Sequence, residues 1–489
     1  MSSQSVNPLT GKSFGPVIAD TENSKLEATI NKSKDAHTIW SNCSYTVKAQ
    51  VLIAIADILD RNVESLAVLA DSETGLGLAR LTGEVARTSF QFREFADELL
   101  TGKLANAQYD SAYEAPLPKG HPSFLKIRYP IGVVAVFGAS NFPFAFGVLG
   151  GDTASALAAG CAVITKGHPS HPQTSLRLVE MATEAIASLN QPRDLISLGF
   201  GIEFGKQLVQ HEGIAAACFT GSKIGGQFLS QLSANRESPI PFYGELGSIN
   251  PVIATPAFIK NNEDFAQRYL DSLFLGNGQF CTKPSVLFVP SAFEIEKHIG
   301  EKVKVSTTQP LLSAHSRDTH NTNRDTLISK GPIHVFSNVV NSEIAITTSN
   351  QVLVFEGSQV FKDPTIIRIE CFGPTGVVVM YDSITELKEL ISILDSALVG
   401  SIFAGENELG ELINLLLVKV GRVAINAWPT GVSVTVGQHH GGSFPASTAP
   451  LHTSVGRDAM LRFLRPVAVQ GLTLNESQHL IGTESYGRL

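Results

Sequence analysis

The sequence is poor in charge and lacks the marks of disulfide-rich, metal-binding and nucleic-acid-binding chains. Only 17% of its 489 residues are charged, and its 37 basic side chains, against 45 acidic ones, form no basic run suited to nucleic acid. Its five cysteines are an odd number without a CxxC pair, which excludes a disulfide scaffold and a structural zinc site and favours a reducing cytoplasm. The first residues, MSSQSVNPLTGK, contain no apolar segment, so we expect no secretory signal peptide.

One uncharged run, residues 129–151, is long enough to cross a bilayer. It reads YPIGVVAVFGASNFPFAFGVLGG, and its two prolines and five glycines would break a continuous helix. We therefore expect no membrane span. The run instead predicts a buried strand at 131–137, a tight turn at 138–141 and the start of a packed helix, because buried parallel strands are continuously apolar.

Elsewhere the chain alternates between helix-like and strand-like segments. From residue 24 to about residue 100, apolar residues recur at three- and four-residue spacing, which predicts amphipathic helices. Between 131 and 222, and again between 245 and 436, short apolar runs alternate with helix-like segments, which is typical of βαβ units and open parallel sheets. The tail from Arg465 predicts an edge strand. The expected fold class is therefore α/β.

Two local patterns carry candidate chemistry. Cys281 lies in GNGQFCTKP, on a glycine-rich loop before an apolar run, where its sulfur can be approached; a small buried hydrophobe is the alternative. Cys161 and Cys218 lie in apolar runs, and we expect them to be buried. Glu245 lies beside glycines and among apolar neighbours, which favours proton transfer, although a solvated glutamate at a strand end fits equally well.

Two predicted strand ends offer binding groups. Asn141 follows the strand at 131–137 and presents an amide where ligands bind in open α/β sheets; an Asx turn that caps the next helix is the alternative. FTGS at 219–222 precedes a helix that we expect to begin near Gly225. Backbone N–H groups at such a helix start suit phosphate, but the glycine spacing by itself is a weak signal.

Taken in order, these segments resemble the motifs of the aldehyde dehydrogenase superfamily. The matching segments are ETG at 73–75, NFP at 141–143, FTGS at 219–222, GELGSINP at 244–251, GNGQFCTKP at 276–284, DPT at 363–365 and ECFGP at 370–374. Several motifs in the right order are far more specific than any one of them, and together they span nearly the whole chain. Departures from the family pattern include Ser140, where tryptophan often precedes the NFP asparagine.

The resemblance implies roles for individual residues in oxidising an aldehyde to a carboxylic acid. Cys281 would attack the carbonyl as a thiolate, and the resulting thiohemiacetal would become a thioester after hydride transfer. Asn141 and the backbone N–H of Cys281 would stabilise the oxyanion, and Glu245 would activate the water that hydrolyses the thioester. His440 would lie near the thiol, with a structural loop histidine as the alternative.

The resemblance also implies an NAD(P) site and no metal. The expected cofactor contacts, from the ribose or 2′-phosphate through the pyrophosphate to the nicotinamide ribose, are Lys166, Gly221, Ser222, Gly226, Glu370 and Phe372. Many NAD-using members carry a glutamate where this chain has Pro169, so a 2′-phosphate would meet less repulsion. We therefore expect NADP as the preferred cofactor and NAD as a tolerated one.

Four further segments resemble a narrower branch, the α-ketoglutaric semialdehyde dehydrogenases, which includes bacterial NADP-preferring fatty aldehyde dehydrogenases. The segments are KGHPSHP at 166–172, NAWPTGVSV at 426–434, HHGGSFPAST at 439–448 and FLRPVAVQ at 463–470. The branch implies α-ketoglutaric semialdehyde (2,5-dioxopentanoate) as the substrate, with fatty or aromatic aldehydes as the alternative.

The substrate expectation turns on what could hold the aldehyde's tail. A carboxylate tail needs a cation, and those near the motifs are Lys283, Arg422 and Arg465, each of which also fits an ordinary salt bridge. An apolar tail is favoured instead by the aromatic residues Phe142, Phe144, Phe146, Trp428 and Phe444.

Two other enzyme classes compete. A coenzyme-A-acylating aldehyde dehydrogenase would use Cys281 without needing Glu245, and a cysteine hydrolase would need no cofactor.

The resemblance implies a Rossmann-like cofactor domain, an α/β catalytic domain and a small β oligomerisation element. We expect residues 1–109 and 129–244 in the first, 245–436 in the second, and 110–128 with 465–489 in the third. Because an edge strand rarely stays unpaired, we expect a homodimer or homotetramer.

Overall fold

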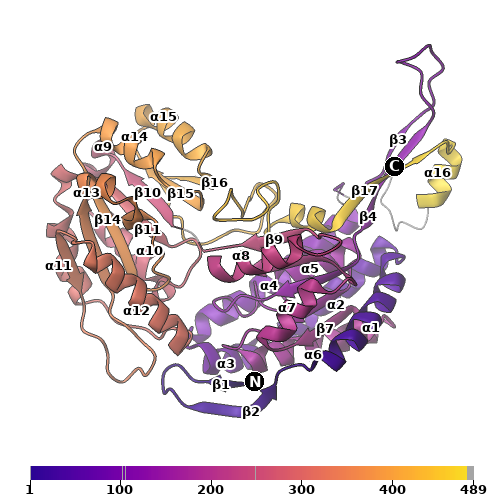
Figure 1. The fold of residues 1–489 in the computed structure, drawn as a ribbon, viewed down its shortest axis with the longest axis horizontal. Coiled ribbons are helices and arrows are strands. Elements are labelled where there is room, and N and C mark those ends of the chain that lie inside the picture. Colours follow the sequence, from indigo (N-terminus) through magenta and orange to yellow (C-terminus); the bar gives the residue numbers. More distant parts are fainter. Residues whose placement is uncertain (1, 102, 105, 248, 482–489) are drawn as a thin grey trace.

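A computed structural model describes residues 2–481, apart from residues 102, 105 and 248. It contains two α/β lobes and a smaller antiparallel sheet that extends away from one of them (Figure 1). A hairpin and four helices come first in the chain: β1 (Ser2–Val6), β2 (Ser13–Ala19), α1 (Asn23–Ser41), α2 (Tyr45–Arg61), α3 (Val63–Thr74) and α4 (Leu78–Thr101). The predicted α/β class and the helical start of the chain are confirmed.

The first sheet has five parallel strands. In spatial order they are β7 (Ile196–Gly199), β6 (Val163–Lys166), β5 (Val133–Phe137), β8 (Ile214–Thr220) and β9 (Phe242–Glu245). The connecting helices are α5 (Gly151–Ala159), α6 (Pro172–Ser188), α7 (Ile202–Gln210) and α8 (Lys223–Ala234). The chain runs from β5 outward through β6 and β7, then returns to the other side of β5 as β8. The strand order therefore reverses between β5 and β8, the position at which ligands bind in such sheets.

The second sheet has seven strands and makes up the other lobe. In spatial order they are β12 (His334–Ser337), β13 (Gln351–Glu356), β14 (Thr375–Tyr381), β11 (Pro284–Pro290), β10 (Asn250–Ala254), β15 (Ala397–Phe403) and β16 (Val420–Ile425). Only β12 pairs antiparallel. The helices of this lobe are α9 (Pro256–Ile259), α10 (Phe265–Phe274), α11 (Ile295–Lys304), α12 (Ala314–Ser329), α13 (Gly357–Lys362), α14 (Ile384–Ser392) and α15 (Glu406–Leu417). They bury one apolar cluster on each face of the sheet.

The third sheet is antiparallel and small. Its central strand is β4 (Phe124–Pro130), flanked by β17 (Leu464–Gln470) and β3 (Gln108–Asp110). A short helix, α16 (Leu474–Ile481), follows β17 and packs on this sheet through Ile481. The residues between β3 and β4 extend away from both lobes (Figure 1). Residues 482–489, the end of the expected oligomerisation element, lie outside the described residues.

The segment 129–151 forms the buried strand expected of it, but not the helix directly after the turn. Every residue of β5 is buried, whereas α5 begins only at Gly151. The intervening loop is so tight that a Cβ on Gly147 would lie 1.9 Å from the carbonyl oxygen of Pro143. The helix expected near Gly225 also differs, since it begins at Lys223. Among the described residues, no helix has the length and apolarity that a membrane crossing requires.

Candidate active site

The loop before Cys281 has an unusual backbone that the sequence allows through glycine and asparagine. Three successive residues, Gly276, Asn277 and Gly278, have positive φ angles of 55°, 57° and 65°. A Cβ on Gly278 would lie 2.2 Å from the carbonyl oxygen of Gly373, so only glycine fits there. The loop leads directly into β11 and leaves Cys281 half-buried. This local fold presents the sulfur instead of packing it into the core.

Two buried side chains hold this loop through hydrogen bonds to backbone carbonyl oxygens. The amide of Asn250 donates to the carbonyl oxygens of Cys281 (2.8 Å) and Lys283 (2.9 Å). The ammonium of Lys283 donates to the carbonyl oxygen of Cys371 and to those of Gly373 and Thr375, both at 2.9 Å. Lys283 therefore holds the ECFGP loop, so of the two roles considered for it the structural one agrees with these contacts.

The sulfur of Cys281 faces a buried histidine–carboxylate pair. Nε2 of His440 lies 3.8 Å from Sγ of Cys281 and 2.9 Å from Oε2 of Glu245. His440 is 2% exposed and Glu245 is 7% exposed, so the pair is nearly dry. Burial opposes the imidazolium charge, but the Glu245 carboxylate and the Cys281 sulfur outweigh it and raise the pKa of His440 to about 10. His440 is therefore an imidazolium at neutral pH.

The loop that carries His440 connects the two lobes at this point. The backbone N–H of His440 donates to Oγ1 of Thr453. Further along the same loop, Ala446 accepts a hydrogen bond from Leu246 and Thr448 donates one to Gly244, next to the end of β9. Residues on either side of Glu245 are thus held by the histidine's own loop, which fixes the histidine–carboxylate pair.

Asn141 also contacts the loop before Cys281. Its side-chain amide donates to the carbonyl oxygen of Gln279, two residues before Cys281, at 2.9 Å. Its own carbonyl accepts a hydrogen bond of 2.6 Å from the guanidinium of Arg80 on α4. Among the described residues, the bond to Gln279 uses one of the two N–H groups of the Asn141 side-chain amide. The structure therefore brings Cys281, Asn141, Glu245 and His440 together.

The remaining cysteines provide a contrast. Cys161 and Cys218 are fully buried, as expected, and burial raises the pKa of both thiols, that of Cys161 to about 11. Burial likewise raises the pKa of Cys371 to about 12. Cys43 is half-buried on the other lobe, where burial raises its pKa as well. Cys281 alone among the five has an imidazolium against its sulfur.

The expected cofactor residues lie along the carboxyl ends of the first sheet's strands. Lys166 ends β6, and burial lowers its pKa while the carboxylate of Asp20 opposes that shift. Ser222 caps α8, accepting the N–H of Gly225 through its hydroxyl oxygen. Gly221 follows β8 at the strand-order reversal, and its N–H donates to the carbonyl oxygen of Glu245. Asp20 was not anticipated, because it lies in the N-terminal hairpin segment, far away in sequence.

The other expected cofactor residues approach from the loops next to the site. A Cβ on Gly226 would lie 2.1 Å from the side chain of Leu246, and a Cβ on Gly247 would lie 1.9 Å from the carboxylate of Glu370. The ECFGP loop therefore abuts the ELG turn after Glu245. Phe372 in that loop is half-buried. Among the expected cofactor residues, Glu370 thus lies on the side of Cys281 and Lys166 lies at the opposite end.

Most of the side chains suggested for the substrate's tail lie elsewhere. Arg422 donates to the carbonyl oxygens of Pro429 and Gly431, and Arg465 stacks on Tyr129 in the third sheet. Phe144 and Trp428 pack in the cores of the two lobes, and Phe444 is exposed. Only Phe142 and Phe146 remain beside the site, together with Phe280.

Sequence reasoning missed Asn250, Arg80 and Arg87. A buried asparagine directly before an apolar strand was the available signal for Asn250. The two arginines lie on α4, whose amphipathic pattern reads as an ordinary surface helix.

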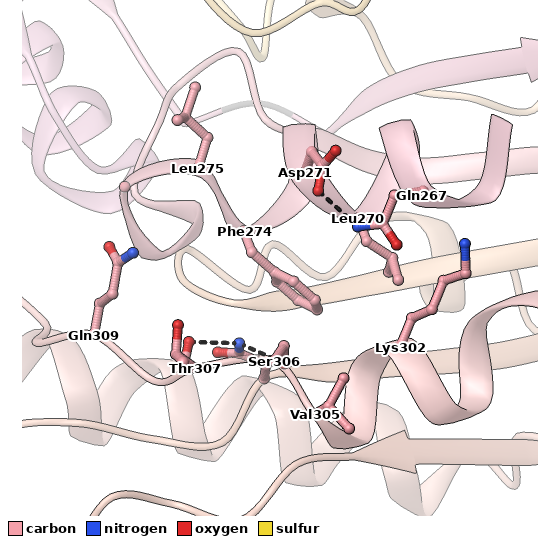
Figure 2. A pocket seen from close by; sticks show the side chains of 12 residues that line it. Gln267, Leu270, Asp271, Phe274, Leu275, Lys302, Val305, Ser306, Thr307 and Gln309 are labelled. Atoms are coloured by element: carbon pink, nitrogen blue, oxygen red, sulfur yellow. Dashed lines mark hydrogen bonds between the residues drawn. The ribbon is translucent and has the colours of Figure 1, made fainter. Parts of the chain in front are cut away.

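A cavity of about 500 Å³ lies near the loop before Cys281 without including Cys281 itself (Figure 2). It is lined from α10 and α11 and by residues 306–309, and it reaches Gly276 but not Cys281, Glu245 or His440. Figure 2 shows Gln267 donating to Asp271 on one wall of this cavity.

The geometry agrees with comparisons to known proteins. The model of the aldehyde dehydrogenase family matches residues 1–461. α-Ketoglutaric semialdehyde dehydrogenase of Acinetobacter baylyi is 33% identical over 98% of this chain and 91% of its own length. α-Ketoglutaric semialdehyde dehydrogenase 2 of Azospirillum brasilense is 36% identical over 93% of this chain and 88% of its own length.

Solved structures share the fold at low identity. NADP-dependent glyceraldehyde-3-phosphate dehydrogenase of Bacillus halodurans, complexed with NADP, has a TM-score of 0.80 at 23% identity and covers 96% of each chain. A mutant of aldehyde dehydrogenase C of Pseudomonas syringae, complexed with NAD⁺ and octanal, has a TM-score of 0.82 at 21% identity. That match covers 97% of this chain and 94% of the other.

These matches define the class of enzyme as an oxidoreductase that oxidises aldehydes with NAD(P). The chain belongs to the aldehyde dehydrogenase family, which confirms the resemblance found in its motifs.

Proposed function

We propose that this enzyme oxidises α-ketoglutaric semialdehyde to the dicarboxylic acid, with NADP preferred and NAD accepted, in the cytoplasm. The observation that carries the chemistry is the contact of Cys281 with His440, and of His440 with Glu245, at 3.8 and 2.9 Å. The names of the two curated relatives support the substrate. Free cysteines throughout the described chain support a reducing compartment.

The cysteine acts as the nucleophile in this proposal. An imidazolium beside the sulfur favours the thiolate, which is the reactive form. Attack on the aldehyde carbon forms a C–S bond and moves the carbonyl electrons onto oxygen. The free N–H of the Asn141 amide and the backbone N–H of Cys281 stabilise that oxyanion, and one such donor is typically worth about 2.7–4 kcal/mol.

Glu245 then serves as the base for water. Because His440 already carries its proton at neutral pH, it cannot accept another, whereas the carboxylate of Glu245 can. Glu245 takes a proton from the attacking water as the C–S bond of the thioester breaks. The carboxylic acid leaves and the thiolate of Cys281 returns beside His440.

The residues at the carboxyl ends of β6 and β8 fit a dinucleotide. The strand order reverses between β5 and β8, and the capped start of α8 offers backbone N–H groups to a pyrophosphate. Gly221, Ser222 and Gly226 line that start, Lys166 would hold the adenosine ribose or its 2′-phosphate, and Glu370 with Phe372 would meet the nicotinamide ribose. The nicotinamide supplies the acceptor for the hydride of the thiohemiacetal. The absence of a carboxylate at position 169 supports NADP. The carboxylate of Asp20, which interacts with Lys166, would accept a hydrogen bond from the 2′-hydroxyl of NAD and so supports NAD as a second cofactor.

The domain and assembly expectations stand as part of this proposal. Residues 1–109 and 129–244 would form the cofactor domain, 245–436 the catalytic domain, and 110–128 with 465–489 the oligomerisation element. The sheet composition supports the division, since β9 of the first sheet ends at Glu245 and β17 pairs with β4. Among the described residues β17 pairs with β4 alone, and its other edge supports a homodimer or homotetramer.

A substrate panel tests the proposal. We would measure kcat/KM for α-ketoglutaric semialdehyde, succinic semialdehyde, hexanal and benzaldehyde, each with NADP and with NAD, by the absorbance of the reduced nicotinamide. The semialdehyde with NADP should give the highest value, and Cys281→Ala should abolish turnover while cofactor binding persists. A tenfold advantage of hexanal, about 1.4 kcal/mol of transition-state preference, contradicts the substrate and favours a fatty aldehyde. Activity that requires coenzyme A would contradict the role of Glu245.

A further inference from the structure

Three side chains on one face of α4 form a buried charged group beside the active site. Arg80, Glu84 and Arg87 are spaced by four and three residues, so they lie along one side of the helix. One carboxylate oxygen of Glu84 accepts the backbone N–H groups of Phe144 (2.8 Å) and Ala145 (3.0 Å), in the loop after Asn141. This side of α4 therefore faces the loop that carries the oxyanion donor.

The two guanidiniums stack on the aromatic rings that surround the nucleophile. Cζ of Arg80 lies 4.9 Å from the ring centre of Phe142 and 4.7 Å from that of Phe280, the residue before Cys281. Cζ of Arg87 lies 5.4 Å from the ring centre of Phe146, whose ring is 6.1 Å from His440. Arg87 is also close enough to Cys281 for an electrostatic interaction with its sulfur. Both cations therefore lie against the aromatic rings next to Cys281 and His440.

The two arginines differ in which of their N–H groups are used. In the described part of the chain, Nη2 of Arg80 donates to Asn141, which leaves its Nε and Nη1 buried without a hydrogen-bond partner. Arg87 has Nε and Nη2 buried without a partner. Nε and Nη2 form one edge of a guanidinium, and that edge binds a carboxylate through two parallel N–H bonds. Arg87 thus presents a whole unused edge.

The charges of the group do not balance. Two guanidiniums, which stay protonated, face the single carboxylate of Glu84. Burial raises the pKa of Glu84 to about 7, although Ala145, Arg80, Phe144 and Arg87 oppose the shift. At least one positive charge is therefore left over in a dry site, and a buried charge without a partner is costly. The nearby pair of His440 and Glu245 is balanced by itself, so within the site only the sulfur of Cys281 offsets this excess, and it does so only until it attacks the aldehyde.

We propose that Arg87 binds the carboxylate at the far end of the aldehyde substrate, and that Arg80 positions Asn141. The proposal rests on the function above, because it assumes an aldehyde oxidised at Cys281. The rings of Phe142, Phe146 and Phe280 each have a guanidinium over them, which makes their surroundings less suited to an apolar tail. The bound tail supplies the missing negative charge, so substrates that bear a carboxylate are selected over apolar aldehydes of equal length.

Length-matched substrates test the proposal. We would compare 4-oxobutanoate with butanal, and 5-oxopentanoate with pentanal, in the wild-type enzyme and in Arg87→Met, Arg87→Lys and Arg93→Met. Arg93 is the matched control, because it lies on the same helix but forms exposed ion pairs with Asp57 and Asp60. Thermal melting checks folding, and Arg87→Lys retains the charge should Arg87→Met prove unstable.

The expected result is a larger loss for the charged substrates. Arg87→Met should lower kcat/KM for the two oxo acids by about 100-fold, mainly through KM, and should lower it at least tenfold less for the two aldehydes, which lose only the interaction of Arg87 with the sulfur of Cys281. Arg87→Lys should recover part of the loss, because lysine keeps the charge without the paired N–H groups. Arg93→Met should resemble the wild type. Equal losses for both members of each pair would overturn the proposal, since Arg87 would then act on the thiolate and not on the tail.

A binding measurement separates this proposal from the proposed function. Titration calorimetry with 2-oxoglutarate, the acid product, should detect binding to the wild-type enzyme and an affinity at least tenfold weaker in Arg87→Met. Suppose that the wild type prefers 5-oxopentanoate to α-ketoglutaric semialdehyde, and that Arg87→Met removes the preference for oxo acids over the matching aldehydes. The named substrate then fails while the carboxylate site stands. If the wild type prefers the uncharged member of each pair, the carboxylate site fails while aldehyde oxidation at Cys281 stands.

Discussion

At the scale of single residues, the ion pair between His440 and Glu245 divides the work of the site. In the proposed mechanism the imidazolium would stabilise negative charge on the sulfur of Cys281, and the carboxylate would accept the water's proton. The two groups act at different steps, so their removal should have different kinetic consequences.

We predict that Glu245→Gln accumulates the thioester. The amide cannot accept a proton from water, so deacylation should slow by about 10²–10⁴-fold. Rapid mixing should then reveal a burst of reduced nicotinamide of about one equivalent, followed by slow turnover. Loss of the burst together with turnover would mean that Glu245 acts before hydride transfer. Unchanged kinetics would mean that its role is structural.

His440→Gln serves as the comparison for that experiment. Without the cation, the burst itself should slow, and alkylation of Cys281 by iodoacetamide should slow at pH 7. The difference from wild type should shrink as the pH rises through about 10, where the wild-type imidazolium loses its proton. The same sign applies to stability: the pKa of His440 is raised on folding, so its contribution is complete below about pH 6.5 and is lost as the pH approaches 10.

The sequence could identify these residues but not their contacts. Cys281, Glu245, Asn141 and His440 lie in short motifs whose order is visible in the chain. Their distances depend on which strands are neighbours, and a separation of 36 residues between Glu245 and Cys281 carries no geometry. Arg87 lay beyond reach for another reason. Its position on a helix face is local, but the absence of a partner for its N–H groups is a property of the packed site.

At the scale of elements, the loop that ends at Cys281 depends on backbone that only glycine tolerates. Gly278 combines a positive φ with a close approach to the ECFGP loop, and both features come from long-range packing. The sequence therefore predicts a glycine-rich loop here, but not the neighbouring backbone with which a side chain at Gly278 would clash.

We predict that Gly278→Ala both destabilises the enzyme and lowers turnover. The left-handed conformation costs about 1 kcal/mol for alanine, and the added Cβ would lie 2.2 Å from the carbonyl oxygen of Gly373, which must move. Gly331→Ala is the control, because Gly331 has a similar φ of 74° but no atom within 4 Å of the added Cβ. Thermal unfolding should be lowered more by Gly278→Ala, and kcat should fall in that variant alone. Equal losses of thermal stability and of kcat in the two variants would mean that they arise from backbone strain and not from the close approach to the ECFGP loop.

The alternation of strands and helices was predictable at this scale, since β5, β8, β11, β14 and β15 lie where apolar runs occur. The start of α5 was not, because the loop of residues 138–150 is shaped by its packing on α4 through Glu84. Residues 300–350 are largely polar, yet they contain α12, whose His320 is buried against Gly373 and Thr375. Polar helices that pack through few side chains leave little periodicity to detect.

At the scale of the whole molecule, the third sheet extends away from the lobe that contains the five-stranded sheet (Figure 1), and the segment between β3 and β4 carries exposed apolar side chains. Leu117 is 88% exposed and Tyr113 is 56% exposed on the segment between β3 and β4. In the described chain β17 pairs with β4 only, so its other edge offers backbone groups to a second chain. A projecting sheet with an open edge and apolar side chains is a surface that association would cover.

We predict that the enzyme is at least a dimer at micromolar concentration, with this sheet in the interface. Sedimentation velocity should give a mass of two or more chains of 52.3 kDa. Leu117→Asp should weaken association at least tenfold, because burying a leucine side chain contributes about 1.5–3 kcal/mol and a buried carboxylate opposes it. Val339→Asp is the control, since Val339 is 86% exposed but lies after β12 on the other lobe. A single 52.3 kDa species in the wild type would contradict the prediction. If both variants weakened association equally, the third sheet would not be the interface.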